Sequence, residues 1–146
     1  MKYSLRIDAE REEEVIVYAH ERSKLTDDIE NLINEADCEL IGYGERDVVR
    51  LDASEITCFI VEDNKVYAIC NTGERMWIKL RLYALEKILG DGFVKLNQSC
   101  IANVKKIKRF DASISGALTV VFKNGYKDYV SRRQLKTVKE RIGFNL

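Results

Sequence analysis

The sequence predicts a mostly β protein with a few short helices, an α+β fold. Short runs of β-branched and aromatic residues recur along most of the chain, and turn residues separate them. Only three stretches carry the apolar spacing of an α-helix. The chain of 146 residues has no proline to interrupt a strand, and 46% of its residues are hydrophobic, which is enough to build a core.

The first 43 residues are predicted to form a small α/β extension. Residues 3–7 and 15–18 have the composition of strands, and residues 39–42 continue the pattern after a helix. That helix is predicted from Leu25 onward, because apolar residues recur there at helical spacing. Thr26 is the predicted N-cap, since its side chain can accept a hydrogen bond from the first turn.

The central part of the chain is predicted to form four strands and one helix. Two of the breaks between strands, residues 62–64 and 71–73, have the composition of hairpin turns. Residues 82–89 resume helical spacing and stop at Gly90, a favourable residue just after a helix. The predicted strands are residues 48–51, 57–61, 66–70 and 75–79.

The last part of the chain is predicted to form strands followed by a terminal helix. Strands are expected at residues 93–96, 107–110 and 118–122, and Asn124-Gly125 supplies a hairpin turn that leads to Tyr129-Val130. The helix spans residues 131–142 with Ser131 as N-cap. Its apolar face carries Leu135, Val138 and Ile142, and its opposite face carries Arg132, Arg133 and Lys136.

Charge is distributed very unevenly, although 24 basic and 24 acidic residues balance overall. Residues 1–46 carry 6 basic and 13 acidic residues, residues 47–92 carry 6 and 8, and residues 93–146 carry 12 and 3. The corresponding net charges are −7, −2 and +9. This gradient predicts a basic surface late in the chain that suits phosphate binding.

Several functional classes find no support in the residues. The four scattered cysteines form no metal-binding or redox pair and are expected to be buried thiols, and no cofactor is expected. No apolar run is long enough for a membrane span or a secretory signal, which favours a cytoplasmic protein. No catalytic motif occurs, and the single histidine, His20, is expected at the surface, so an enzyme is not expected.

Three pieces of sequence together resemble the LytTR family of DNA-binding domains. They are Leu82-x-x-Leu85-Glu86 before a glycine, the stretch from Phe93 to Asn103, and Asn124-Gly125-x-x-x-Tyr129-Val130-Ser131-Arg132-Arg133. The resemblance covers residues 44–146 and implies an elongated, mostly β domain with short helices. Such domains are output modules of bacterial response regulators, and their strand-connecting loops and the start of the last helix enter successive major grooves.

The resemblance implies a set of DNA-contacting residues. Base- or phosphate-facing roles fall on Lys65 in the first hairpin, on Asn97 and Gln98 in the central loop, and on Arg133 in the last helix, while Arg132 and Lys136 become backbone contacts. Arginine and glutamine can bond base edges in bidentate fashion, and lysine can neutralise phosphates. The family often has His-Arg where Asn97-Gln98 stands here, so the resemblance does not fix the preferred DNA sequence.

The resemblance also bears on residues 1–43. Response regulators of this family carry a receiver domain of roughly 120 residues, for which 43 residues leave no room. Control by aspartyl phosphorylation is therefore not expected. We expect this acidic extension to mediate homodimerisation or contact with a partner, and the family implies promoter direct repeats as the target and a membrane protein as a regulator.

Other readings of the same residues stay open at this point. The protein could be a non-catalytic interaction module on the same fold, or a binder of single-stranded RNA that stacks bases on Trp77, Tyr67, Tyr83 and Phe93. These aromatics are more often core residues at such spacing. The last helix could simply expose a solvated cationic face, residues 97–99 could be a simple turn, and Asn103 is expected to cap the turn at residues 104–106.

Overall fold

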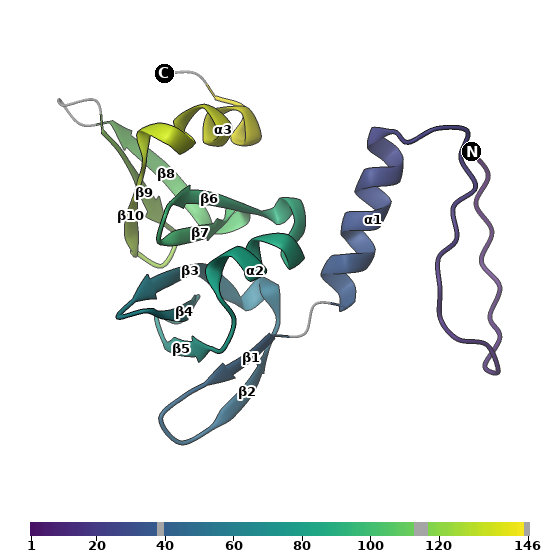
Figure 1. Cartoon of the computed structure of the whole chain (residues 1–146), viewed down its shortest axis with the longest axis horizontal. Helices are drawn as coiled ribbons and strands as arrows, with labels where there is room; N and C mark the ends of the chain where they lie inside the picture. Colours follow the sequence, from purple (N-terminus) through teal and green to yellow (C-terminus); the bar gives the residue numbers. More distant parts are fainter. Residues whose placement is uncertain (38–39, 113–116, 145–146) are drawn as a thin grey trace.

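The computed structural model describes residues 1–37, 40–112 and 117–144. It contains two antiparallel sheets and three α-helices (Figure 1), which confirms the predicted α+β class. The helices are α1 (Lys24–Asp37), α2 (Leu82–Ile88) and α3 (Arg132–Ile142). The strands are β1 (Leu40–Tyr43), β2 (Val48–Leu51), β3 (Ile56–Glu62), β4 (Lys65–Cys70), β5 (Arg75–Ile78), β6 (Phe93–Asn97), β7 (Cys100–Asn103), β8 (Ile107–Ala112), β9 (Leu118–Phe122) and β10 (Lys127–Val130).

The larger sheet has seven strands in the order β2-β1-β5-β4-β3-β7-β6. Its predicted hairpin turns are confirmed by backbone angles that few residues tolerate. Asp63 and Asn64 have φ values of 52° and 62° between β3 and β4, and Gly73 has a φ of 90° between β4 and β5. Short polar residues and glycine accept this left-handed region at low cost, which is why the chain reverses at these points.

The smaller sheet has three strands in the order β10-β9-β8, and it leads directly into α3. The predicted Asn-Gly turn joins β9 to β10, with a φ of 90° at Gly125. The side chain of Asn124 accepts a hydrogen bond from the amide of Tyr126 at 3.0 Å, which closes the turn. Helix α3 spans the predicted residues and ends before Gly143, whose φ is 82°.

Two buried clusters lie on opposite faces of the larger sheet. The first packs Phe59, Met76 and Ile78 against Leu85 and Leu89 from the α2 region. The second packs residues of β3, β6 and β7 against the smaller sheet and α3, with Phe122 and Val138 fully buried. The larger sheet is therefore a central layer that holds α2 on one face and the smaller sheet with α3 on the other.

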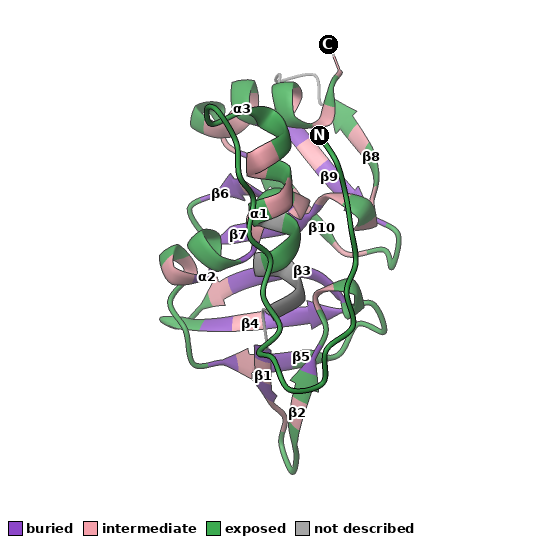
Figure 2. Cartoon of the chain, turned by 90° about the vertical axis from the view of Figure 1, so that its right-hand side faces the viewer, coloured by how far each residue is buried: buried purple, intermediate pink, exposed green. Residues whose placement is uncertain are grey.

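The two strands predicted at residues 3–7 and 15–18 do not form. Residues 1–23 are described in full and contain no strand, and all of them are exposed (Figure 2). Isoleucine, valine and tyrosine favour extended backbone, but a strand also needs a hydrogen-bonded neighbour. The backbone bond from Arg11 to Asp8 at 3.4 Å marks only a turn in this segment. The N-terminal α/β extension thus consists of extended chain and α1.

The start of α1 also differs from the prediction. The helix begins at Lys24, and Ser23 precedes it. The Ser23 amide donates to Oγ1 of Thr26 at 2.9 Å, and the Thr26 amide donates to Oγ of Ser23 at 3.4 Å. Ser23 therefore takes the capping position predicted for Thr26, and Thr26 completes the reciprocal pair from within the helix.

Strands β1 and β7 also differ from the sequence prediction. Sequence patterning placed residues 40–43 in the N-terminal extension, and in the structure β1 pairs with β2 and β5 inside the larger sheet. The apolar segment after Ser99 was not predicted to be a strand, yet β7 lies between β3 and β6. It is buried throughout, so it shows no alternation of polar and apolar residues that could have indicated a strand.

Several single-residue expectations can be compared with the structure. Cys58, Cys70 and Cys100 are free and buried as predicted, whereas Cys38 lies outside the described residues. His20 is exposed, also as predicted. The Asn103 side chain accepts from the amide of Lys105 at 3.2 Å and caps the following turn, which confirms its predicted role. Within the described ranges, none of the helices is long and apolar enough to cross a membrane.

Candidate nucleic-acid interface

The first candidate contact surface is the β3–β4 hairpin. Lys65 is the first residue of β4, directly after the tight turn, and its side chain is exposed. Its ammonium lies 5.2 Å from the ring centroid of Trp77 on the neighbouring strand β5. This cation–π contact restricts a side chain that would otherwise be very mobile. The hairpin therefore presents a positive charge at a defined position.

The second candidate surface is the loop between β6 and β7, where Asn97 and Gln98 differ sharply in exposure. Asn97 is only 2% exposed, whereas Gln98 is exposed to solvent. The Asn97 Nδ2 group donates to Oδ1 of Asp128 at 2.9 Å and to the carbonyl of Tyr129 at 2.8 Å. Its Oδ1 accepts from the amide of Ser99 at 2.8 Å.

These bonds give Asn97 a structural function in the free protein. Both N–H donors and the carbonyl oxygen of its side chain form hydrogen bonds within the protein. If this amide turned toward a base, its internal partners would lose those hydrogen bonds. Such burial does not agree with the base- or phosphate-facing role that the resemblance implied for Asn97. Gln98 is the exposed amide of the loop. Residues 97–99 also form a turn between β6 and β7, which agrees with the alternative interpretation of this segment as a simple turn.

The third candidate surface is the start of α3. The Ser131 amide donates to the carbonyl of Leu96 at 2.9 Å, so the entry to the helix is bonded to the end of β6. Ser131 is the N-cap residue, as predicted, although its side chain makes no capping hydrogen bond. Arg132, Arg133 and Lys136 are all exposed. No ion pair joins any of these three to a carboxylate among the residues that the structure describes.

The three surfaces lie on the same side of the molecule. In Figure 1, the β3–β4 turn, the β6–β7 turn and the start of α3 are all on the left, whereas α1 and the N-terminal segment are on the right. Backbone bonds tie them together, because the Val61 amide donates to the carbonyl of Ser99 at 2.9 Å. The hairpin is thus joined to the loop, and the loop to the helix.

The structure adds basic residues that the sequence reasoning did not select. Lys79 and Arg81 follow β5 and line a groove together with Lys65, Lys95 and Gln98. The sequence does show two basic residues on either side of Leu80, between a predicted strand and a predicted helix. Such a pattern is common on solvated surfaces, so it does not indicate a binding site by itself. The grouping becomes visible only when β5 is placed beside β4.

The aromatic residues considered as a stacking platform do not share one environment. Phe93 is buried in the core, Tyr83 is 65% exposed on α2, and Trp77 and Tyr67 are half-buried. Trp77 lies opposite Tyr67 on β4 and opposite Tyr43 on β1. The guanidinium of Arg75 lies 4.8 Å from the Tyr67 ring centroid, so cations already contact the rings of this row. Phe93 fits the expected core position, and Tyr67 packs at the edge of the second buried cluster.

Residues 46–143 match the LytTr DNA-binding domain family. The chain belongs to the LytTR family. The match spans every element from β2 to α3, including all three candidate surfaces. DNA binding is therefore the function of this LytTR domain, and the family recognised from the sequence is confirmed.

Curated relatives extend the similarity beyond the LytTR domain. Regulators from Staphylococcus aureus strains MSSA476 and MW2, each described as an uncharacterized HTH-type transcriptional regulator, are 32% identical over 145 residues. These alignments cover 97% of this chain and 98% of the relatives. The similarity thus includes the segment that precedes the LytTR domain.

A solved structure supports the fold of the LytTR domain. The LytTr DNA-binding domain of a Bacillus cereus response regulator matches with a TM-score of 0.68 and 20% sequence identity. The match covers 73% of this chain and 97% of the solved domain. Although the relatives are described as HTH-type, strands separate all three α-helices in the described part of this chain. A helix-turn-helix unit needs two helices joined by a short turn.

Proposed function

We propose that this protein is a transcriptional regulator that binds specific duplex DNA sequences, and that it reads the major groove with two loops and the start of α3. The roles are divided by chemistry. Gln98 and Arg133 contact base edges, because an amide and a guanidinium can each form paired hydrogen bonds with a base. Lys65, Arg132 and Lys136 contact phosphates, which orients the domain on the duplex.

The observation that carries this proposal is the hydrogen-bonded junction at residues 96–99. Leu96 accepts from the amide at the start of α3, Asn97 binds β10, and Ser99 accepts from the hairpin strand β3. Loops joined in this way keep their spacing, and a fixed spacing lets several side chains meet one duplex together. The relatives described as transcriptional regulators support the same function.

Selection of bound duplexes from a random pool tests this proposal directly. We expect a defined sequence to be enriched, and its binding to weaken steeply with salt because several phosphates are contacted. A scrambled duplex of the same composition is the control. Recovery of no common sequence, together with salt-independent binding, would instead support a protein-interaction module.

We also propose that the N-terminal extension holds two copies of the protein together. Tyr3, Leu5 and Ile7 are 86%, 70% and 87% exposed, and they alternate along an extended segment without a strand partner. Exposed apolar residues in such a row are unfavourable in water and typical of an interface. The unpaired backbone of the same segment can also bond to another chain. Two copies held together would supply one LytTR domain for each of the two repeats that we expect in the target promoter.

Light scattering of the full-length protein tests the dimer. We expect the double variant Leu5→Asp, Ile7→Asp to have half the mass of the wild-type particle, because two charges would have to be buried in the interface. Val48→Asp is the control, since Val48 is also exposed but lies on β2 of the LytTR domain. A monomeric wild type would contradict the proposal, as would a dimeric double variant.

Location and regulation follow from the proposed DNA binding. We propose that the protein acts in the cytoplasm, where bacterial DNA is accessible, and that a membrane protein restrains it from the cytoplasmic side. We assign the acidic N-terminal segment as the surface that this membrane protein binds when the dimer dissociates. Crosslinking in intact cells should join the regulator to a membrane protein through residues 1–23, and crosslinks confined to the LytTR domain would argue against it.

A further inference from the structure

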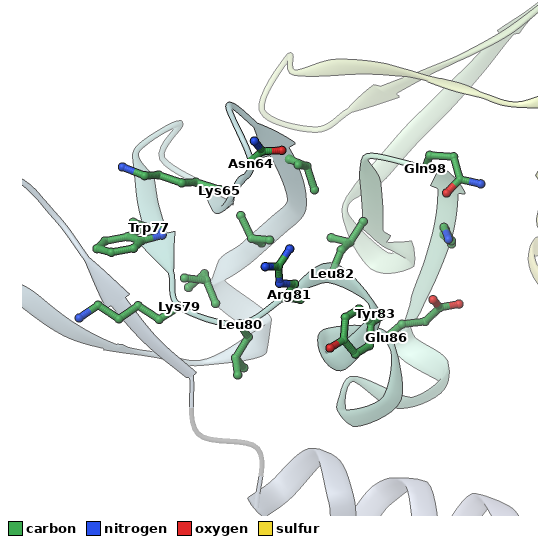
Figure 3. Close-up of a pocket in the computed structure, with 14 residues that line it drawn as sticks. Asn64, Lys65, Trp77, Lys79, Leu80, Arg81, Leu82, Tyr83, Glu86 and Gln98 are labelled. Atoms are coloured by element: carbon green, nitrogen blue, oxygen red, sulfur yellow. The ribbon is translucent and has the colours of Figure 1, made fainter.

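A groove of about 600 Å³ lies between the β3–β4 hairpin and β5 on one side and α2 with the β6–β7 loop on the other. Two of the proposed DNA contacts, Lys65 and Gln98, are among the residues that line it. Figure 3 shows Lys65, Trp77 and Lys79 along one side, Gln98 and Glu86 along the other, and Arg81 between them. The groove therefore connects two of the proposed contact surfaces.

The lining of this groove is strongly cationic. Lys65, Lys79, Arg81 and Lys95 line it, and Glu86 is the single carboxylate among its lining residues. Across the described part of the chain, no ion pair connects any of these four cations to a carboxylate. In Figure 3, Arg81 lies between the two sides of the groove, and the Lys65 and Lys79 side chains extend along one edge of it, away from Gln98 and Glu86. Positive charges gathered at one groove repel one another unless an anion lies near them. The groove is thus suited to an anionic occupant.

Aromatic rings hold two of these cations in place. The Lys79 ammonium lies 4.2 Å from the Tyr43 ring centroid and 5.1 Å from that of Trp77. The Lys65 ammonium lies 5.2 Å from the same Trp77 centroid. Tyr43 and Trp77 are cross-strand partners whose ring centroids are 5.7 Å apart. Cations that contact rings lose less conformational freedom when they bind an anion. They also leave less ring surface for stacked bases, which argues against single-stranded RNA.

The position of the groove indicates which anion it holds. This step rests on the proposed function, in which Lys65 contacts a phosphate while Gln98 reaches a base edge in the major groove. A sugar–phosphate strand borders that groove, so this strand passes between the hairpin and the β6–β7 loop. We propose that the groove binds this DNA backbone, with Lys79 and Arg81 as phosphate contacts and with Tyr43 and Trp77 as positioning residues.

Salt titrations of the full-length protein on its selected duplex test the phosphate contacts. Lys79→Gln and Arg81→Gln should each make the slope of log K against log salt shallower by about 0.9, the effect of one phosphate contact. Both should weaken selected and random duplexes by the same factor, because phosphates carry no sequence information. Lys87→Gln is the matched control, since Lys87 is exposed on α2 and does not line the groove.

A double-mutant cycle tests the positioning residues. Tyr43→Leu should weaken binding and Tyr43→Phe should not, because phenylalanine keeps the ring that Lys79 contacts. In a Lys79→Gln background, Tyr43→Leu should cost no further affinity, whereas a general structural defect would persist there. Thermal unfolding of each variant shows whether the fold is intact, and the comparison is made among folded variants.

The outcomes separate this inference from the proposed function. Wild-type protein that selects no duplex would overturn both. Sequence-specific wild-type binding with unchanged slopes for Lys79→Gln and Arg81→Gln would overturn the groove assignment alone. Tighter binding of the single strand than of the duplex, lost in the same two variants, would also overturn it and assign the groove to single-stranded nucleic acid.

Discussion

At the scale of single residues, the adjacent amides of Asn97 and Gln98 lie in different environments. Asn97 is enclosed by the bonds to Asp128, Tyr129 and Ser99, whereas Gln98 faces solvent. A buried amide is stabilising only while its partners are satisfied. We therefore assign loop geometry to Asn97 and base contact to Gln98.

Substitution of these two residues should separate stability from recognition. Asn97→Ala should lower the free energy of unfolding by about 1–3 kcal/mol, because it removes the hydrogen bonds that this buried amide makes to Asp128, Tyr129 and Ser99. Gln98→Ala should leave stability unchanged and alter the preferred base at one position. Denaturant unfolding and duplex selection measure the two effects. Equal stability of both variants would contradict the structural role of Asn97.

Arg133 and Lys136 lie one turn apart on α3 and should differ in kind. Arg133→Ala should cost about 1–3 kcal/mol in binding to the selected duplex and relax preference at one base pair. Lys136→Ala should weaken all duplexes alike and reduce the salt slope by about 1. Competition binding with selected and random DNA distinguishes them. Equal losses on both DNAs for Arg133→Ala would exclude base readout by this arginine.

Tyr126 provides a pH-dependent test of the contact between the smaller sheet and the core. Burial, followed by the nearby Cys58 and Asp128, raises the pKa of Tyr126 from 10 to about 12. The unfolded chain therefore loses this proton at lower pH than the folded protein does. The stabilising contribution is fully present below about pH 10 and is lost as the pH rises toward about 12.

Stability curves of the wild type and Tyr126→Phe should reveal this contribution. Both proteins should lose stability in alkali as other groups titrate, and the wild type should fall more steeply between about pH 10 and about pH 12. Denaturant unfolding at several pH values measures the difference. Parallel curves would show that the Tyr126 hydroxyl is as accessible in the folded protein as in the unfolded chain.

At the scale of elements, α3 depends on its apolar face for its position, and its polar face carries the basic residues for which we propose DNA contact. Val138 is fully buried, and Leu135 and Ile142 pack at the edge of the same cluster. This apolar face packs against β6, and its position sets the direction in which the basic residues of the opposite face project. The same helix in isolation would be too short to be stable in water.

Removal of buried volume beneath α3 should destabilise the protein. Val138→Ala should lower the free energy of unfolding by about 2 kcal/mol, because it removes two buried methyl groups and leaves a small cavity. Thr137→Ala is the control on the exposed side of the helix and should change stability by less than about 0.5 kcal/mol. Thermal or denaturant unfolding measures both. Similar stability of the two variants would show that α3 contributes little to the core.

At the scale of the whole molecule, charge is segregated although the total is zero. In Figure 1, α1 and the N-terminal segment, which belong to the acidic first third, lie on the right, whereas the smaller sheet and α3, which belong to the basic last third, lie on the upper left. Exposed charges farther apart than about 8–10 Å are largely screened at physiological salt. The two ends can thus act independently in the cell and interact through their fields at low salt.

Neutralising the acidic run should increase the rate of DNA association at low salt only. The triple variant Glu12→Gln, Glu13→Gln, Glu14→Gln removes three negative charges and raises the net charge from zero to +3. A weaker repulsive field should speed the encounter with DNA, and salt should abolish the gain. Stopped-flow association at several salt concentrations measures it. A gain that persists at high salt would indicate a direct contact between the run and the DNA-binding surface.

Much of the fold and part of the candidate interface could be predicted from sequence. The hairpins at residues 62–64 and 124–125 were predictable because few residue types accept positive φ, and α3 because its apolar residues follow one face. The burial of Asn97 was not predictable, because the residues that enclose it are 31 and 32 positions away. Local composition contains no record of such distant partners.

The sequence by itself determined the helices, the turns, the basic end and the LytTR family, because each depends on residues close together in the chain or on a motif. Only the tertiary structure decided which extended segments became strands. Residues 40–43 found neighbours in β2 and β5, and residues 3–7 found none, although both have strand-forming composition. A strand forms only where another extended segment lies beside it and accepts its hydrogen bonds. The packing of the whole molecule determines which segments become neighbours.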